Sequence, residues 1–154
     1  MKAVVNGKIV LKNGVLENKV IVFDKKIIDI CDEVPTNCEI IDAKGNYVCP
    51  GLIDIHIHGC KGFDAMDEDE NAVEIISKGL AETGVTSFLP TTMTMSPERI
   101  YKAFENIIKA KNKSIKGAKV LGAHMEGPFI NEKYKGAQNP KYIYIVFFFW
   151  WNIL

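Results

Sequence analysis

The stretch around which this chain is organised runs from Pro50 to Gly59 and reads PGLIDIHIHG. Its apolar residues predict a β-strand over residues 52–58, and successive residues of a strand point to opposite faces. His56 and His58 therefore project side by side from one face. Two imidazoles on one rigid face form half of a site for a divalent transition metal. The alternative is a pair of ordinary core histidines held by hydrogen bonds.

The chain from Leu52 onward alternates apolar runs with segments of helical periodicity. We expect strands at residues 52–58, 85–90 and 118–124, each apolar throughout, as in strands that are buried in a parallel sheet. Helices are expected from about residue 70 to 83 and from Ser96 onward, where a hydroxyl residue precedes a proline. This β-α-β-α-β order predicts an α/β fold with a parallel sheet.

The spacing of these strands favours one parallel architecture. They begin about 33 residues apart, whereas a (β/α)8 barrel of roughly 250 residues averages about 31 residues per unit. Polar residues follow each strand: His56 and His58, then Thr91, then His124 and Glu126. Because barrel enzymes carry their sites at the carboxyl ends of strands, we expect a truncated TIM barrel of about three βα units. A doubly wound open sheet is the alternative, but the sequence lacks its usual glycine-rich phosphate loop.

Residues 1–50 show a different pattern of short β-rich runs separated by turns. Asn13-Gly14 is a strong signal for a two-residue hairpin between two such runs. We expect a small antiparallel β-module, similar to a β-sandwich, that precedes the barrel and has a packing role only.

The composition excludes several classes of partner and compartment. Nineteen basic residues balance nineteen acidic ones, so the chain offers no excess charge for nucleic acid or an anionic membrane. The first residues lack the uninterrupted apolar core of a signal peptide. The four cysteines show neither Cys-x-x-Cys spacing nor a dense framework, and we expect reduced thiols in a cytoplasmic protein.

A second motif, HMEGPF at residues 124–129, identifies a family together with the first. The stretch from Pro50 to Gly59 resembles the amidohydrolase superfamily, and the second motif resembles the N-acetylglucosamine-6-phosphate deacetylases within it. Residues 84–91 and 135–140 add to this resemblance, which covers residues 1 to about 142. It implies a metal-dependent hydrolase that cleaves a linear amide bond, with acetate and glucosamine 6-phosphate as products, in amino-sugar catabolism.

The resemblance also implies a set of metal ligands. Glu126 would bind the main divalent ion, and His56 and His58 would hold a second one. The cofactor would therefore be one or two ions of zinc, iron, manganese or cobalt. Such an ion polarises the amide carbonyl of the substrate and activates a water molecule.

The resemblance further implies where the sugar lies. In the family the loop corresponding to residues 135–140 is near the substrate, so Ala137 and Gln138 are expected to bind it, together with His124, which shapes the site. Many members have histidine at the position of Gln138, and an ordinary surface turn is the alternative for this loop. The implied partner is a small amino-sugar phosphate, with no nucleic acid and no membrane, and the intact family is expected to form homo-oligomers.

The end of the sequence departs from the family pattern. After Lys141 it reads YIYIVFFFWWNIL, which is apolar or aromatic except for Asn152 and contains both tryptophans. The run is shorter than the roughly 20 residues of a membrane-spanning helix, and it is not amphipathic like an interfacial helix. We interpret residues 142–154 as a tail that arises from a shifted reading frame or a truncation, with a hydrophobic anchor as the alternative.

Three parts are therefore expected: a β-module over residues 1–50, a partial hydrolase barrel over residues 51–141, and the tail. In the family two further histidine ligands, the catalytic aspartate and a phosphate-binding arginine come later in the chain. No catalytic residue can be assigned here, and the chain itself is expected to be inactive. Two alternatives remain: another metal-dependent amidohydrolase, such as a cyclic amidase or aminohydrolase, and a non-enzymatic β/α module that binds a partner through its tail.

Overall fold

A computed structural model describes residues 1–144 of the chain. The tail predicted over residues 142–154 therefore lies, apart from its first three residues, outside the described residues. The chain divides into two compact units, Met1–Pro50 and a second unit that begins at Gly51. Within residues 1–144, every helix is too short or too polar to cross a membrane.

The first unit consists of seven short strands in two sheets. The larger sheet has the order β5-β4-β1-β6 and is built from β1 (Lys2–Val5), β4 (Val20–Phe23), β5 (Ile27–Cys31) and β6 (Glu39–Asp42). The smaller sheet has the order β3-β2-β7 and is built from β2 (Lys8–Leu11), β3 (Gly14–Leu16) and β7 (Tyr47–Val48). Ala3, Val20 and Val22 form a small buried cluster in the larger sheet.

The expected antiparallel module is confirmed only in part, because the first unit combines antiparallel strand pairs with parallel ones. Strand β1 pairs in parallel with β6, and β2 pairs in parallel with β7. The β2–β3 hairpin turns at Lys12 and Asn13, because Leu11 pairs with Gly14, so the Asn13-Gly14 signal placed the turn one residue late. Apolar runs indicate which residues form strands. They do not indicate which strands pair, because pairing depends on contacts between distant parts of the chain.

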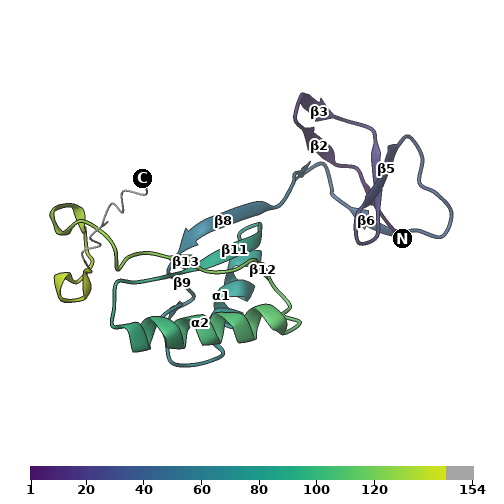
Figure 1. Ribbon diagram of the computed structural model, residues 1–154. Helices are drawn as coiled ribbons and strands as arrows, with labels where there is room; N and C mark the ends of the chain where they lie inside the picture. Colours follow the sequence, from purple (N-terminus) through teal and green to yellow (C-terminus); the bar gives the residue numbers. More distant parts are fainter. Residues whose placement is uncertain (145–154) are drawn as a thin grey trace, which may run out of the picture. The chain divides into compact units, whose positions relative to one another are not determined.

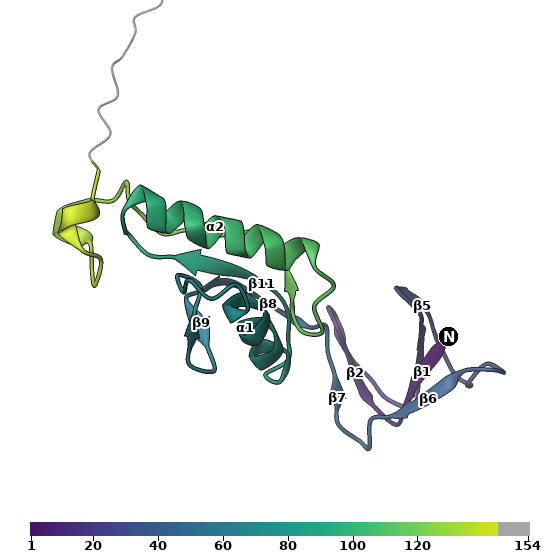
Figure 2. The same ribbon diagram turned by 90° about the horizontal axis from the view of Figure 1, so that it is seen from below.

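The second unit is built on a parallel sheet, which confirms the predicted mixed α/β fold. Strand β11 (Val85–Thr92) pairs in parallel with each of the other three strands, β8 (Leu52–Ile57), β12 (Lys119–Val120) and β13 (His124–Met125). Figures 1 and 2 show both helices, α1 (Ala72–Ala81) and α2 (Pro97–Asn112), on the same side of this sheet. The remaining elements are short: strands β9 (Gly59–Cys60) and β10 (Phe63–Asp64), and the single-turn helices η1 (Glu132–Tyr134) and η2 (Pro140–Tyr142).

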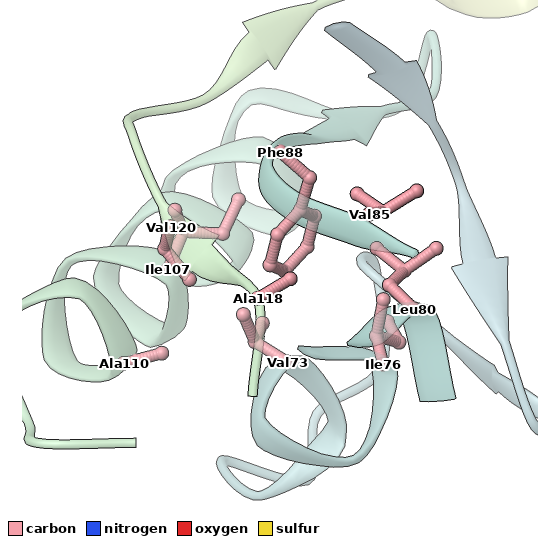
Figure 3. Packing of buried hydrophobic residues seen from close by; sticks show 9 residues of the cluster. All are labelled: Val73, Ile76, Leu80, Val85, Phe88, Ile107, Ala110, Ala118 and Val120. Carbon is pink, nitrogen blue, oxygen red and sulfur yellow. The ribbon is translucent and has the colours of Figure 1, made fainter. Parts of the chain in front are cut away.

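The core of the second unit forms where the helices meet the sheet. Phe88 of β11 is completely buried, and its ring packs among apolar side chains of both helices and of β12 (Figure 3). On α1, the buried residues Val73, Ile76 and Leu80 recur at helical spacing and form the face turned to the sheet. The side chains that anchor the sheet to the helices therefore come from the middle of β11, a few residues before its carboxyl end.

The expected burial of the first strand is wrong. The run over residues 52–58 was expected to be buried, yet Leu52, Ile53 and Ile55 are 62, 61 and 64% exposed. Within the described residues β8 pairs with β11 alone, so it is an edge strand, and an apolar run is buried only if other layers cover it.

The third strand, expected over residues 118–124, is interrupted. Phe88 pairs with Val120 and Thr91 pairs with His124, so the third strand has one residue more than β11 between these two pairs. An extra residue on one strand breaks the ladder locally, as a β-bulge does. The chain therefore leaves the sheet after Val120 and rejoins it at His124, two residues before Glu126.

The neighbouring residues Ile107 and Ile108 of α2 allow a matched test of this core. Ile107 is 2% exposed and Ile108 is 56% exposed. We expect Ile107→Ala to lower the free energy of unfolding by about 2–5 kcal/mol, because it leaves a cavity against Phe88. Ile108→Ala should change it by no more than about 0.5 kcal/mol. Urea denaturation followed by circular dichroism measures both, and equal losses would contradict the packing described here.

A pH-dependent contact joins the two helices at Glu74. Its carboxylate accepts hydrogen bonds from Lys113 at 2.7 Å and from Lys78 at 2.8 Å. These bonds, that from Lys113 first, lower the pKa of Glu74 from 4.5 to about 2. The folded-state pKa is depressed, so the stabilisation is present above pH 4.5 and is lost as the pH falls toward 2.

We therefore expect Glu74→Gln to lower the urea midpoint at pH 7, with a difference from the wild type that shrinks between pH 4.5 and 2. Glu105→Gln is the matched control, because Glu105 lies on α2 and has one ion pair, to Lys102 at 3.9 Å. Its effect at pH 7 should be smaller. A pH-independent loss in Glu74→Gln would show that the ion pairs do not cause the effect.

Candidate metal centre

Two histidines and a glutamate converge at the carboxyl ends of the parallel strands. His56 belongs to β8, His58 follows that strand directly, and Glu126 follows β13. The Nε2 atoms of His56 and His58 lie 2.9 and 3.0 Å from the same oxygen, Oε2 of Glu126. If one ligand atom is taken from each of the three residues, these atoms all lie within 4.8 Å of one another. The three side chains predicted to share a site are therefore in contact.

The end of β8 is fixed to β11 by bonds that also orient His58. Thr91 Oγ1 accepts a hydrogen bond from Ile57 N at 3.0 Å. The Nδ1 atom of His58 lies 3.2 Å from the carbonyl oxygen of Thr91. Because a carbonyl oxygen can only accept, Nδ1 carries a proton, which leaves Nε2 as the nitrogen that can bind a metal. Metal-binding histidines commonly donate their second nitrogen to such an acceptor.

His124 lies beside this group of three side chains. Its Nδ1 atom donates to the carbonyl oxygen of Ile55 at 3.0 Å, and its ring centroid is 4.5 Å from that of His56. The His124 ring thus packs on His56 and is tied to the backbone of β8. Its nitrogens are not among the ligand atoms that converge on Glu126.

The loop after Glu126 returns to the site through Gln138. The Nε2 atom of Gln138 donates to Glu126 Oε1 at 2.6 Å, and its Oε1 atom accepts from Thr94 N at 2.8 Å. Gln138 is 4% exposed, whereas its neighbour Ala137 is exposed. Sequence reasoning placed both residues in the site but missed Thr94. Thr94 donates to Gln138 through its backbone N–H, a contact for which the sequence carries no signal.

The surroundings of Glu126 keep its carboxylate charged. Burial raises the pKa of Glu126, but the hydrogen bonds from Gln138 and His56 and the positive charges of His58 and His56 outweigh it and lower the pKa below its ordinary value. The side chain is ionised at neutral pH and can act as a metal ligand.

Comparison with known proteins identifies the family. Residues 47–141 match the model of the amidohydrolase family. This chain belongs to the amidohydrolase family. The identification that the two sequence motifs predicted is thereby confirmed.

Deacetylases of amino-sugar phosphates are among the relatives. The chain is 39% identical over 147 residues to the N-acetylglucosamine-6-phosphate deacetylase of Bacillus subtilis, a match that covers 92% of this chain and 36% of that protein. It is 31% identical to the N-acetylgalactosamine-6-phosphate deacetylase of Escherichia coli O157:H7, over 87% of this chain and 35% of that protein. The chain thus spans about a third of the length of these curated relatives.

Solved structures agree with the sequence relatives. The N-acetylglucosamine-6-phosphate deacetylase of Pasteurella multocida superposes with a TM-score of 0.85 at 32% identity, over 94% of this chain and 39% of that chain. A D-hydantoinase superposes less well, with a TM-score of 0.55 at 29% identity, over 85% of this chain and 28% of that chain.

The donor set of this amidohydrolase fits a divalent metal. Two imidazole nitrogens and one ionised carboxylate oxygen suit zinc and other first-row transition metals. The site is also accessible, since the side chains of His56 and Glu126 are 47% and 29% exposed. Three protein ligands with room for a further ligand are typical of catalytic zinc sites.

Gly127 is required next to Glu126 for two reasons. Its φ of +74° lies in the left-handed region, and a Cβ atom there would be 1.9 Å from Thr94 Oγ1. That hydroxyl already donates to the carbonyl oxygen of Glu126 at 3.3 Å. A side chain at residue 127 would therefore push apart the two segments that hold Glu126.

Gly136 provides a matched control for this requirement. Its φ is +57°, but a Cβ atom there would meet nothing within 4 Å. We expect Gly136→Ala to cost about 1–2 kcal/mol for the left-handed backbone alone, and Gly127→Ala to cost about 1–3 kcal/mol more because of the clash. Urea denaturation of the two variants measures the difference. Equal costs would show that Thr94 does not constrain residue 127.

Proposed function

We propose that this amidohydrolase takes part in the metal-dependent deacetylation of N-acetylglucosamine 6-phosphate, giving acetate and glucosamine 6-phosphate. The observation that carries the proposal is the convergence of His56 and His58 on Glu126 at the carboxyl ends of parallel strands. The deacetylase of Bacillus subtilis, 39% identical over 92% of this chain, supports the choice of reaction and substrate.

We propose that residues 51–141 form the first part of a TIM barrel and that residues 1–50 form a β-sandwich-like module. The three parallel β-segments and two helices fit such a beginning. The exposed apolar side chains of β8 also support it, because closing a barrel would cover an edge strand. The relatives, which are nearly three times as long as the match, contain the additional residues that closure requires.

The three site residues would hold one or two ions of zinc, iron, manganese or cobalt. Glu126 would bind through Oε2, and His56 and His58 would bind through Nε2. When bound, a divalent ion polarises the amide carbonyl and makes water a better nucleophile at neutral pH. The main-chain carbonyl of Thr91 would keep the His58 proton on Nδ1, away from the ion.

We propose that Ala137 and His124 contact the substrate, whereas Gln138, which was also expected to bind it, is buried and bonds to Glu126 instead. His124 lies next to His56, and Ala137 is exposed on the loop that brings Gln138 to Glu126. A phosphorylated sugar substrate favours the cytoplasm as the compartment, and we propose a homo-oligomer without nucleic acid or membrane partners.

Two other substrates have specific support. The relative from Escherichia coli O157:H7 favours the galactosamine isomer, in which one hydroxyl group has the opposite configuration. The D-hydantoinase structure favours a cyclic amide, but its TM-score of 0.55 is well below the 0.85 of the deacetylase. The higher identity to the glucosamine enzyme and its higher TM-score support N-acetylglucosamine 6-phosphate as the first choice.

A chimeric enzyme tests the proposal. Residues 1–141 replace the matching region of the Bacillus subtilis deacetylase. Acetate release is measured with both N-acetylated sugar phosphates, and opening of the ring is measured with hydantoin. We expect turnover of N-acetylglucosamine 6-phosphate, reduced at least about a hundredfold by Glu126→Gln, since metal activation contributes several kcal/mol. Glu105→Gln, on an exposed side chain of α2, should leave the rate unchanged.

The chimera also separates the alternatives. Preference for the galactosamine isomer would change the assigned substrate, and hydrolysis of hydantoin alone would place the protein with the cyclic amidases. A folded, metal-loaded chimera that hydrolyses none of the three compounds would contradict the proposed function.

A further inference from the structure

Gln138 uses both ends of its side-chain amide inside the protein. The side chain is buried, at 4% exposure, and its Oε1 atom accepts a hydrogen bond from Thr94 N at 2.8 Å. Its Nε2 atom donates to Glu126 Oε1 at 2.6 Å. Thr94 follows β11 and Glu126 follows β13, so one amide connects the ends of two neighbouring strands.

The orientation of this amide is determined by its partners. A backbone N–H can only donate, so the oxygen of Gln138 must face Thr94. The NH₂ group must then face the carboxylate of Glu126, which at neutral pH can only accept. Flipping the amide would place a donor against a donor and an acceptor against an acceptor. Gln138 is therefore a fixed N–H donor to Glu126.

The local backbone holds Gln138 in place on both sides. Upstream, Asn131 Oδ1 accepts from Lys133 N at 2.9 Å and starts helix η1. Downstream, Asn139 Oδ1 accepts from Lys141 N at 3.0 Å and starts helix η2. Gln138 lies between these two turns, and its own N–H donates to the carbonyl oxygen of Lys135 at 3.0 Å. These backbone contacts hold the loop in a conformation that directs the buried side chain of Gln138 toward Glu126.

The two carboxylate oxygens of Glu126 consequently have different partners. Oε1 is occupied by Gln138, whereas Oε2 faces the Nε2 atoms of His56 and His58 at 2.9 and 3.0 Å. An ion shared with the histidines would therefore be bound through Oε2 and not through Oε1.

We propose that Gln138 is a positioning residue that holds the Glu126 carboxylate so that Oε2 alone is presented to a metal ion, which makes Glu126 a monodentate ligand. This inference rests on the proposed function, because it takes Glu126 as a metal ligand. It goes beyond the expected contact with a substrate, since Gln138 acts here through another side chain.

Cobalt(II) titration of the 154-residue chain tests the inference. Gln138→Met keeps the length of the side chain but removes its hydrogen bonds to Thr94 and Glu126, together with a longer one to Met93 Sδ at 3.7 Å. We expect it to weaken Co²⁺ binding about 10- to 100-fold, as is usual when a residue that orients a ligand is lost. In infrared difference spectra of the Co²⁺ complex, the two carboxylate stretches should be widely separated in the wild type, as in monodentate ligation. They should move closer together in Gln138→Met, because Oε1 is released.

Asn106→Leu is the matched control. Asn106 is also a buried amide, and it donates to the carbonyl oxygens of Asp67 and Glu68 at 3.2 and 3.4 Å. Its replacement removes buried hydrogen bonds, but none that involve Glu126. We expect unchanged Co²⁺ affinity and an unchanged carboxylate spectrum, which separates positioning from a general loss of stability.

The possible outcomes distinguish the inference from the proposed function. If Gln138→Met does not fold, Gln138→Asn serves instead, since its shorter side chain cannot reach both Thr94 and Glu126 and should show the same loss. Wild-type affinity and spectrum in either folded variant would overturn the inference and leave the proposed function intact. If the wild type binds Co²⁺ no more tightly than Glu126→Ala, both are overturned, because no ion then meets the carboxylate.

Discussion

The parallel pairing of β11 with its neighbours is the constraint on which the second unit depends. Pro90 pairs with Ile57 on one side and Thr91 pairs with His124 on the other. These pairs bring His56 and Glu126, which are 70 residues apart, to a distance of 2.9 Å. Slipping either neighbour by one residue would reverse the faces of its side chains. The site is therefore as well defined as the register of the sheet, and that register is held by the buried contacts of β11 with the two helices.

The apolar runs and the polar residues that follow them were sufficient to predict the main elements of the second unit. They identified the strands, the helix that starts after Ser96 and the contact of His56 and His58 with Glu126. They did not predict the exposure of β8, because the composition of a strand does not specify which layers cover it. The interruption of the third strand was also missed, since one additional residue becomes a bulge only relative to the partner strand.

The supporting contacts of the site were the hardest part to predict, for a different reason. Thr94 acts on Gln138 through its backbone N–H, which every residue other than proline possesses, so side-chain identity gives no signal. Gln138 was singled out by family resemblance as a residue near the substrate. Its bond to Glu126 depends on the path of a loop between two single-turn helices. Sequence motifs indicate the candidate metal ligands. The residues that orient these ligands are recognised only from their contacts in the structure.

A neutral amide at residue 138 is well suited to a metal ligand. A lysine or arginine there would also hold Oε1, but its positive charge would oppose that of the ion and neutralise Glu126. An aspartate or glutamate would repel the Glu126 carboxylate and offer the ion a competing ligand. The amide of Gln138 donates a hydrogen bond that lowers the pKa of Glu126 without adding a charge. Because Gln138 occupies Oε1, Oε2 is the carboxylate oxygen that remains for an ion, and the Nε2 atoms of both histidines face it.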